Sequence, residues 1–295
     1  MLYDIRVSIR YDYDRPAAAG RHLLRLLPAS LAGQQRLLAG SLTVMPAPAE
    51  RFEFTDFFGN RVTEIVTAPG QSEITFTATA RVDRSAPEAV LDISPPLVGL
   101  ADELADLADL GPDSPHHFLG RSPRIAPLPA AVDWARDATM GAATVAELAD
   151  RLNAALHAAM TFDAEATTVD TPPAEAFRTR RGVCQDFAQV MIAALRGMGV
   201  PAAYVSGFLR TVPPPGKPRL EGADAMHAWV RVWCGLDMGW IGFDPTNACR
   251  AGADHITVAH GRDYGDVPPV AGVLRIWGKQ KSRQGVDVIA VSGPA

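Results

Sequence analysis

Alternation of apolar and polar residues dominates the first ninety residues of the chain. Tyr3, Ile5, Val7, Ile9 and Tyr11 alternate with polar residues, which is the two-residue period of a half-buried strand. The same period returns at Phe52 and Phe54, before a turn at residues 58–60, and again over Ile74, Phe76, Ala78, Ala80 and Val82. Strands separated by turn residues in this way predict an antiparallel β-sandwich-like N-terminal domain over residues 1–95.

After Ser94, Pro95 and Pro96 the pattern changes to a helical period. Leucines at positions 97, 100, 104, 107 and 110 fit one helix. Thr144 and Glu147 have the spacing of a capping box, and they open a second helix that carries Leu148, Leu152 and Leu156. The sequence therefore predicts a second domain over residues 96–295 and an α+β fold class.

A third helix begins at Cys184, directly after Gly182 and Val183. Phe187, Ala188, Met191, Ala194, Leu195 and Met198 recur at steps of three and four residues, and Gly199 and Pro201 end the helix. Backbone N–H groups and the helix dipole at such a position stabilise a thiolate and lower a thiol pKa from about 8.5. Cys184 is a candidate nucleophile, with a buried structural cysteine as the alternative.

Two short strands downstream carry candidate partners for this thiol. His227 lies in the alternating run of residues 226–233, and Asp244 ends the run of residues 239–244. If Cys234 pairs with Gly239 across the intervening turn, His227 and Asp244 are diagonal neighbours on one sheet face, roughly 7–8 Å apart at Cα. A register slip of one residue would instead send Asp244 to the opposite face.

A thiol, a base and an acid in this order are the components of a Cys-His-Asp triad, in which each group activates the one before it. Each residue also has an ordinary structural interpretation. A single histidine in a strand is commonly a structural or surface group, and an aspartate before a proline is a common turn opener. The three together favour the catalytic interpretation.

Four segments resemble those of the bacterial transglutaminase-like cysteine enzymes, and they occur in the order of that family. They are residues 182–188, 199–208, 227–229 and 239–247. The resemblance covers about residues 140–270 and implies a papain/transglutaminase-like core, with a cysteine-bearing helix on an antiparallel sheet. It implies Cys184 as nucleophile, His227 as general base and acid, and Asp244 as the residue that orients the histidine. The run of residues 255–269 also resembles the bacterial branch, without an implied role.

The predicted activity is hydrolysis of a peptide or amide bond through a thioester acyl-enzyme, with a peptide or protein as substrate. Transfer of the acyl group to an amine, as in transglutaminases, uses the same three residues and is the close alternative. A non-catalytic binding module of the same fold is the alternative from a different class. The Cys184 N–H is expected to donate a hydrogen bond to the oxyanion of the intermediate, and the second oxyanion donor is not identified. Asp186 is expected to cap backbone N–H groups, whereas the Gln185 side chain need not point into the site.

Composition and charge narrow the class of protein. Hydrophobic residues make up 47% and charged residues 21%, as in soluble globular proteins, and no apolar run approaches a membrane span. A net charge of −5 argues against non-specific nucleic-acid binding. The N-terminus lacks signal-peptide features, and three cysteines fit a reducing compartment, so we expect a cytoplasmic protein. We expect no cofactor and no metal; the oligomeric state stays open.

Two further expectations concern the remaining cysteines and one loop. Cys234 and Cys249 are expected to be structural, with a disulfide between them as the alternative. Residues 210–221 are rich in proline and predict a loop between the nucleophile and base segments. This loop either borders the substrate cleft or is a solvated connector.

Overall fold

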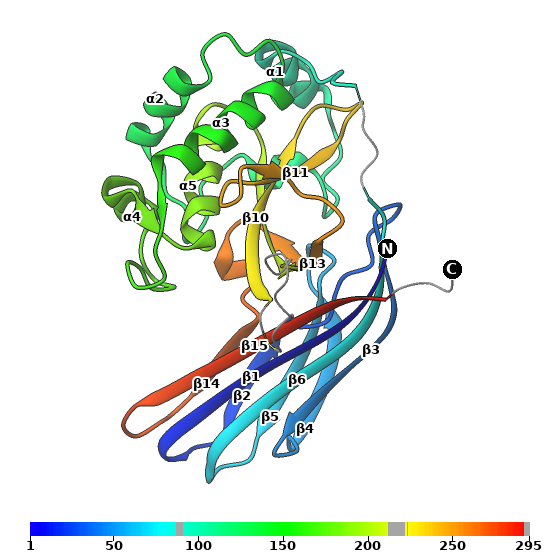
Figure 1. Ribbon diagram of the computed structural model, residues 1–295, viewed down its shortest axis with the longest axis vertical. Helices are drawn as coiled ribbons and strands as arrows, with labels where there is room; N and C mark the ends of the chain where they lie inside the picture. Colours follow the sequence, from blue (N-terminus) through cyan, green and yellow to red (C-terminus); the bar gives the residue numbers. More distant parts are fainter. Residues whose placement is uncertain (87–90, 212–221, 223, 292–295) are drawn as a thin grey trace, which may run out of the picture.

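Helices gather at one end of the molecule and long antiparallel strands at the other (Figure 1). The computed structural model describes residues 1–86, 91–211, 222 and 224–291. Antiparallel sheets and α-helices both occur in these residues, so the predicted α+β class is confirmed. The predicted loop of residues 210–221 falls mostly on residues 212–221, outside the described residues.

Two four-stranded antiparallel sheets form the predicted sandwich. The first has the order β15-β1-β6-β3, with β15 Gln280–Val291, β1 Leu2–Ala17, β6 Gln71–Arg84 and β3 Gln35–Met45. The second has the order β14-β2-β5-β4, with β14 Val270–Leu274, β2 Gly20–Leu24, β5 Arg61–Thr67 and β4 Glu50–Thr55. His22 of β2 lies 5.7 Å from Phe76 of β6 between ring centroids, and both are buried, so side chains of the two sheets meet in one core.

The last two strands of the chain join the N-terminal sheets. β15 pairs with β1 from Leu2 to Tyr13, and β14 pairs with β2. The predicted division placed residues 270–291 in the second domain, whereas their strand pairing places them in the sandwich. β1 pairs along both of its edges, with β6 on one side and β15 on the other. Such long-range pairing leaves no local signature in the sequence, which is why the division missed it.

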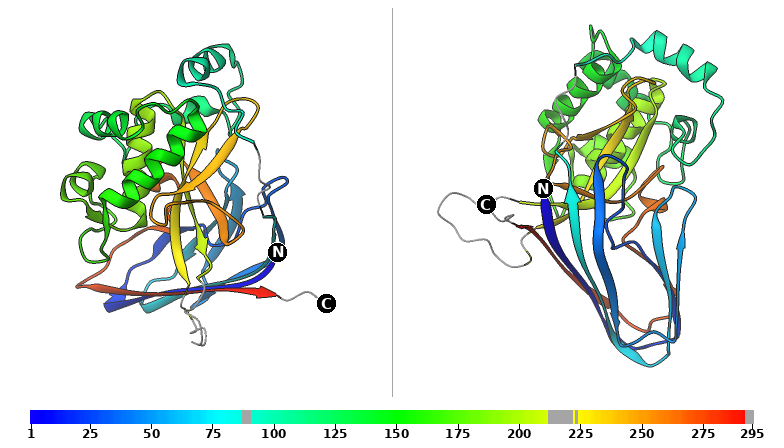
Figure 2. Two further views of the ribbon diagram at one scale, coloured as in Figure 1. Left: turned by 45° about the horizontal axis from the view of Figure 1, so that its top comes forward. Right: turned by 90° about the vertical axis from the view of Figure 1, so that its right-hand side faces the viewer.

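A third antiparallel sheet carries the candidate site. Its order is β12-β11-β10-β9-β13, with β12 Cys249–Arg250, β11 Trp240–Asp244, β10 Ala225–Trp233, β9 Ala202–Leu209 and β13 His255–Gly261. A short parallel pair, β7 Thr161–Phe162 and β8 Arg181–Gly182, precedes the cysteine-bearing helix. Figure 2 shows the helices beside this sheet and away from the sandwich strands.

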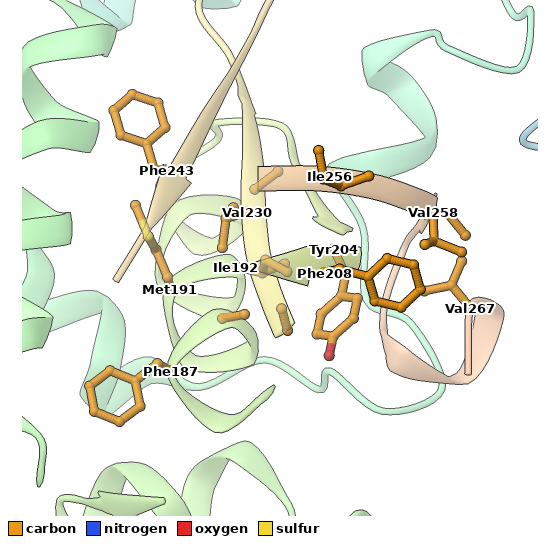
Figure 3. Close-up of a cluster of buried hydrophobic side chains, with 14 of the residues drawn as sticks. Phe187, Met191, Ile192, Tyr204, Phe208, Val230, Phe243, Ile256, Val258 and Val267 are labelled. Carbon is orange, nitrogen blue, oxygen red and sulfur yellow. The ribbon is translucent and has the colours of Figure 1, made fainter. Parts of the chain in front are cut away.

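Helix α5, Cys184–Gly197, is the central element of the second domain. It contacts β9 and β10 as well as three other helices, α2 Pro129–Ala138, α3 Val145–Ala159 and α4 Pro173–Thr179. Every residue from Gln185 to Arg196 is buried. Figure 3 shows part of the core, where Phe187, Met191 and Ile192 of this helix lie with side chains of the sheet. A helix enclosed on all sides holds its first residue in a defined place.

The other two predicted helices form, one of them shorter than expected. Helix α3 begins after Thr144, whose hydroxyl accepts the Glu147 N–H at 3.2 Å, as the capping pattern predicted. Helix α1, Leu97–Asp106, ends before the last two leucines of its predicted stripe, and Leu110 is exposed. Leu107 is extended, and the Asp109 side chain accepts the Gly111 N–H at 3.0 Å, so a turn replaces the last helical turns. None of the described helices has the length and apolar content needed to cross a membrane.

Candidate active site

The turn before α5 presents Cys184 at the surface end of a buried helix. Cys184 is partly exposed, although the twelve residues that follow it are buried. The Asp186 N–H donates to the Val183 carbonyl at 2.8 Å, whereas the N–H groups of Cys184 and Gln185 have no helix carbonyl one turn earlier to bind. The interpretation of Cys184 as a buried packing residue is therefore not favoured. Cys234 is buried and Cys249 is exposed, and both are free thiols, so the alternative of a disulfide between them is not observed.

Asp186 organises this turn. Its Oδ2 accepts the Val183 N–H at 2.8 Å and the Thr167 hydroxyl at 2.6 Å, which confirms its predicted capping role. The carboxyl group is buried, and burial raises its pKa. Gln185 points to a different loop, where its Nε2 donates to the Val169 carbonyl at 3.1 Å. Neither side chain is engaged with the candidate histidine.

Gly182 is required by the close approach of Asp186. A Cβ atom at position 182 would lie 2.5 Å from Oδ2 of Asp186 and 2.8 Å from its Cγ. We expect Gly182→Ala to lower the free energy of unfolding by about 1–3 kcal/mol, because the capping carboxylate must move. Thermal melting checks this prediction. Gly120→Ala is the matched control, because a Cβ there meets nothing within 4 Å; equal melting temperatures for the two variants would contradict the argument.

Strands β10 and β11 bring His227 and Asp244 together. Val230 pairs with Phe243 and Trp233 pairs with Trp240, and the Cys234 N–H donates to the Gly239 carbonyl at 2.8 Å. This is the register predicted from the sequence. The distance from Nε2 of His227 to Oδ2 of Asp244 is 2.7 Å, and both side chains are buried.

Hydrogen bonds hold the Asp244 carboxylate on both of its oxygens. Oδ1 accepts the N–H groups of Thr246 and Asn247 at 3.0 and 3.2 Å, and Oδ2 accepts the Asn247 side-chain amide at 2.7 Å. Burial alone would raise the pKa of Asp244, but hydrogen bonds from His227, His255 and Asn247 outweigh it and hold the pKa well below its usual range. Asp244 is therefore a fully buried carboxylate that stays ionised.

His227 is the partner of both the acid and the thiol. Burial would lower the pKa of His227, but its hydrogen bond to Asp244 and its interaction with Cys184 raise the pKa to about 10. Because Nε2 donates to Asp244, Nδ1 is the nitrogen available to the Cys184 thiol. The three residues predicted from the sequence thus lie in one cluster, drawn from α5, β10 and β11.

Two residues to which the sequence pattern assigns no role complete the cluster. Asn247 follows Asp244 in the same turn, and His255 of β13 donates through Nε2 to Oδ2 of Asp244 at 3.1 Å. Asn247 and His255 both lie in segments that resemble the family, and this resemblance was the only feature of the sequence that pointed to them. Their proximity to Asp244 depends on strand β13 and on the turn after β11.

His227, Asp244 and His255 also form the potential metal-ligand set among the described residues, with ligand atoms within 4.8 Å of one another. The hydrogen bonds oppose that use. The Gly252 N–H donates to Nδ1 of His255 at 3.1 Å, so the ring proton of His255 is on Nε2, the atom that a metal would need. A metal-bound histidine instead donates through its second nitrogen. The donor set does not fit a metal.

Comparison with known proteins agrees with this architecture. The family model described as the transglutaminase-like superfamily matches residues 132–245, and that of the bacterial transglutaminase-like N-terminal region matches residues 3–83. An uncharacterized protein of Mycobacterium tuberculosis (strain ATCC 25618 / H37Rv) is 36% identical over 255 residues, which cover 82% of this chain and 77% of the relative.

Two further proteins differ in how much of this chain they match. A protein-glutamine gamma-glutamyltransferase of Pseudomonas aeruginosa is 36% identical over 105 residues, 35% of this chain and 15% of that enzyme. The crystal structure of a candidate cysteine protease from Cytophaga hutchinsonii is similar in fold, with a TM-score of 0.75 and 21% identity over 100% of this chain and 92% of that one. The chain belongs to the bacterial transglutaminase-like proteins.

Proposed function

We propose that this protein is a cysteine-dependent acyl-transfer enzyme that hydrolyses a peptide or amide bond. The observation that carries the proposal is the buried hydrogen bond of 2.7 Å between His227 and Asp244, next to the thiol that opens α5. A nucleophile, a base and an orienting acid in contact are the requirement for activating a weak nucleophile. Membership in the transglutaminase-like superfamily supports the same chemistry.

In the first step the Cys184 thiolate attacks the substrate carbonyl carbon, and a C–S bond forms. N–H groups at the start of α5, that of Cys184 among them, face the oxygen on which negative charge develops. His227 then gives its Nδ1 proton to the leaving nitrogen, the C–N bond breaks, and a thioester remains. Asp244 keeps the proton of Nε2 in place throughout, so that Nδ1 is the nitrogen that exchanges protons.

In the second step Nδ1 of His227 takes a proton from the acceptor, which attacks the thioester carbonyl; the C–S bond breaks, and the Cys184 thiolate and the protonated His227 are restored. Water as acceptor gives hydrolysis, whereas an amine gives transamidation. The name of the Pseudomonas aeruginosa relative favours transamidation as the second candidate, but the match to that enzyme covers 35% of this chain. The two activities share the site and differ only in the acceptor.

Incubation with a library of glutamine-containing peptides, with and without an amine donor, separates these outcomes by product mass. Cleaved or deamidated peptides indicate hydrolysis, and peptides joined to the donor indicate transamidation. The Cys184→Ala variant is the control for contaminating activity. Absence of every product, together with no alkylation of Cys184 by iodoacetamide near neutral pH, would refute the enzymatic proposal and favour a binding module of the same fold.

A further inference from the structure

His255 extends the site beyond the three residues of the proposed mechanism. It lies at the start of β13, which is separated from β10 by β9, and it is buried. Its Nε2 lies 3.1 Å from Oδ2 of Asp244, the same oxygen that accepts His227 at 2.7 Å. One carboxylate oxygen at the end of β11 therefore accepts hydrogen bonds from two histidines, one on the adjacent central strand β10 and one on the edge strand β13.

The orientation of the His255 ring is determined by a second hydrogen bond. The Gly252 N–H donates to Nδ1 at 3.1 Å, so Nδ1 is an acceptor and Nε2 carries the proton that points at Asp244. The direction of donation is thus set by the backbone and not by the carboxylate. His255 is held as a donor to Asp244 before any substrate binds.

Trp229 packs the two histidines in place. Its ring lies 5.3 Å from that of His255 and 6.2 Å from that of His227, measured between centroids. Gly207 leaves the room for it, because a Cβ there would lie 2.5 Å from the Trp229 ring and 2.2 Å from the Ile256 carbonyl oxygen. The indole is buried and packs beside both imidazoles.

We infer that His255 is a positioning residue: its Nε2 proton holds Oδ2 of Asp244 against His227, so that the working unit is Cys184, His227, Asp244 and His255. This inference rests on the proposed cysteine-dependent function. If Oδ2 of Asp244 loses one hydrogen-bond donor, the carboxylate rotates toward another donor. Its hydrogen bond to His227 then lengthens. Asn247 also donates to Oδ2 but comes from the same turn as Asp244, so it moves with the carboxylate.

The effect on pH dependence follows from the groups around the pair. In the part of the chain that the structure describes, the titratable groups that interact with His227 or Asp244 are Cys184 from α5, Cys249 from β12 and His255 from β13. The hydrogen bond that His227 donates to Asp244 opposes the effect of burial and helps to keep the pKa of His227 raised. Without the His255 donor this hydrogen bond weakens, and the alkaline limb of kcat/KM, which reports loss of the His227 proton, moves to lower pH.

The experiment compares three substitutions at one position in the full-length chain. His255→Phe removes the donor, His255→Gln keeps an N–H at the position of Nε2, and His255→Asn carries an amide that is one carbon too short. We expect kcat to fall about 10- to 100-fold in His255→Phe and His255→Asn, with KM within about twofold of the parent. We expect His255→Gln to recover most of kcat and the original alkaline limb.

His260→Phe is the matched control, because His260 is a buried histidine of the same strand with no contact to Asp244. This variant should keep the kcat of the parent. The decrease in its melting temperature measures how much stability is lost when a buried imidazole is removed. If His255→Phe retains the kcat of His260→Phe, or if His255→Gln is as impaired as His255→Asn, the inference is wrong. The Gln and Asn pair decides the question even if His255→Phe does not fold.

Alkylation of Cys184 by iodoacetamide, followed on its own peptide by mass spectrometry, separates this inference from the proposed function. It needs no substrate, and because the thiolate is the reacting form, it reports the state of the Cys184 and His227 pair. We expect about tenfold slower alkylation near neutral pH in His255→Asn than in His255→Gln. If alkylation is slower in His255→Asn but the protein has no turnover, the proposed hydrolase is refuted and the positioning role of His255 stands. If the enzyme is active but both variants are alkylated at the normal rate, the positioning role is refuted and the proposed function stands.

Discussion

Replacement of Cys184 by alanine is expected to reduce turnover by about 10⁴-fold or more, because removal of a nucleophile leaves only binding and oxyanion stabilisation. Folding should be nearly unchanged. Cys184 is partly exposed at the first position of α5, and alanine is a good helix former, so little packing is lost. The measurement is kcat/KM on the peptide identified from the library, together with thermal melting.

Cys249→Ala is the control for the thiol chemistry. Cys249 is exposed and lies on β12, opposite Asp244 in the strand pairing, so it is the second thiol near the site. This variant should keep its activity and lose only one alkylation site. Activity that survives in Cys184→Ala and disappears in Cys249→Ala would assign the nucleophile to the other cysteine.

Replacement of Asp244 by asparagine is expected to lower kcat by about 10³- to 10⁴-fold, because Oδ2, which accepts from His227, His255 and Asn247, is replaced by an NH₂ group that donates. Oδ1 accepts two backbone N–H groups, so the asparagine oxygen takes that place and its NH₂ faces His227. The His227 Nε2 must then accept, and its proton moves to Nδ1, facing the thiol. In this tautomer His227 no longer accepts a proton from Cys184.

The pH dependence of the variant distinguishes a wrong tautomer from a loss of folding. Burial lowers the pKa of His227, but Asp244 and Cys184 together raise it to about 10, and the variant loses the part that Asp244 contributes. The alkaline limb of kcat/KM should therefore move to lower pH. Asp263→Asn is the control, because Asp263 is also a buried carboxylate that accepts backbone N–H groups, those of Gly265 and Arg124. Comparable losses of kcat in both variants would contradict the tautomer argument.

Local pattern was sufficient for several parts of the fold. The start of α5, its end near Gly199, the cap of α3 at Thr144 and the register of β10 with β11 all match their predictions. Each depends on residues that are close in sequence, where capping, glycine and turn length leave few alternatives. The alignment of His227 with Asp244 followed from the turn between their strands.

Long-range pairing was not accessible in the same way. The return of β14 and β15 to the sandwich and the placement of His255 beside Asp244 depend on strands that are distant in the chain. The strand of residues 280–291 does not specify its partner locally, because any free strand edge would satisfy its backbone hydrogen bonds. The choice among edges is made by the packing of the whole molecule.

The sequence by itself therefore determined which chemical groups are present and that Cys184 opens a helix, because a thiol next to a helix start is a local property. It also predicted a hairpin register that aligns His227 with Asp244, and the structure selects this register over a slip of one residue. Only the tertiary structure decided that α5 places its first residue beside that hairpin and that β13 supplies a second histidine to the same carboxylate. The reason is physical: both depend on burying the whole of α5 and the central sheet in one core, and no single segment contains that information.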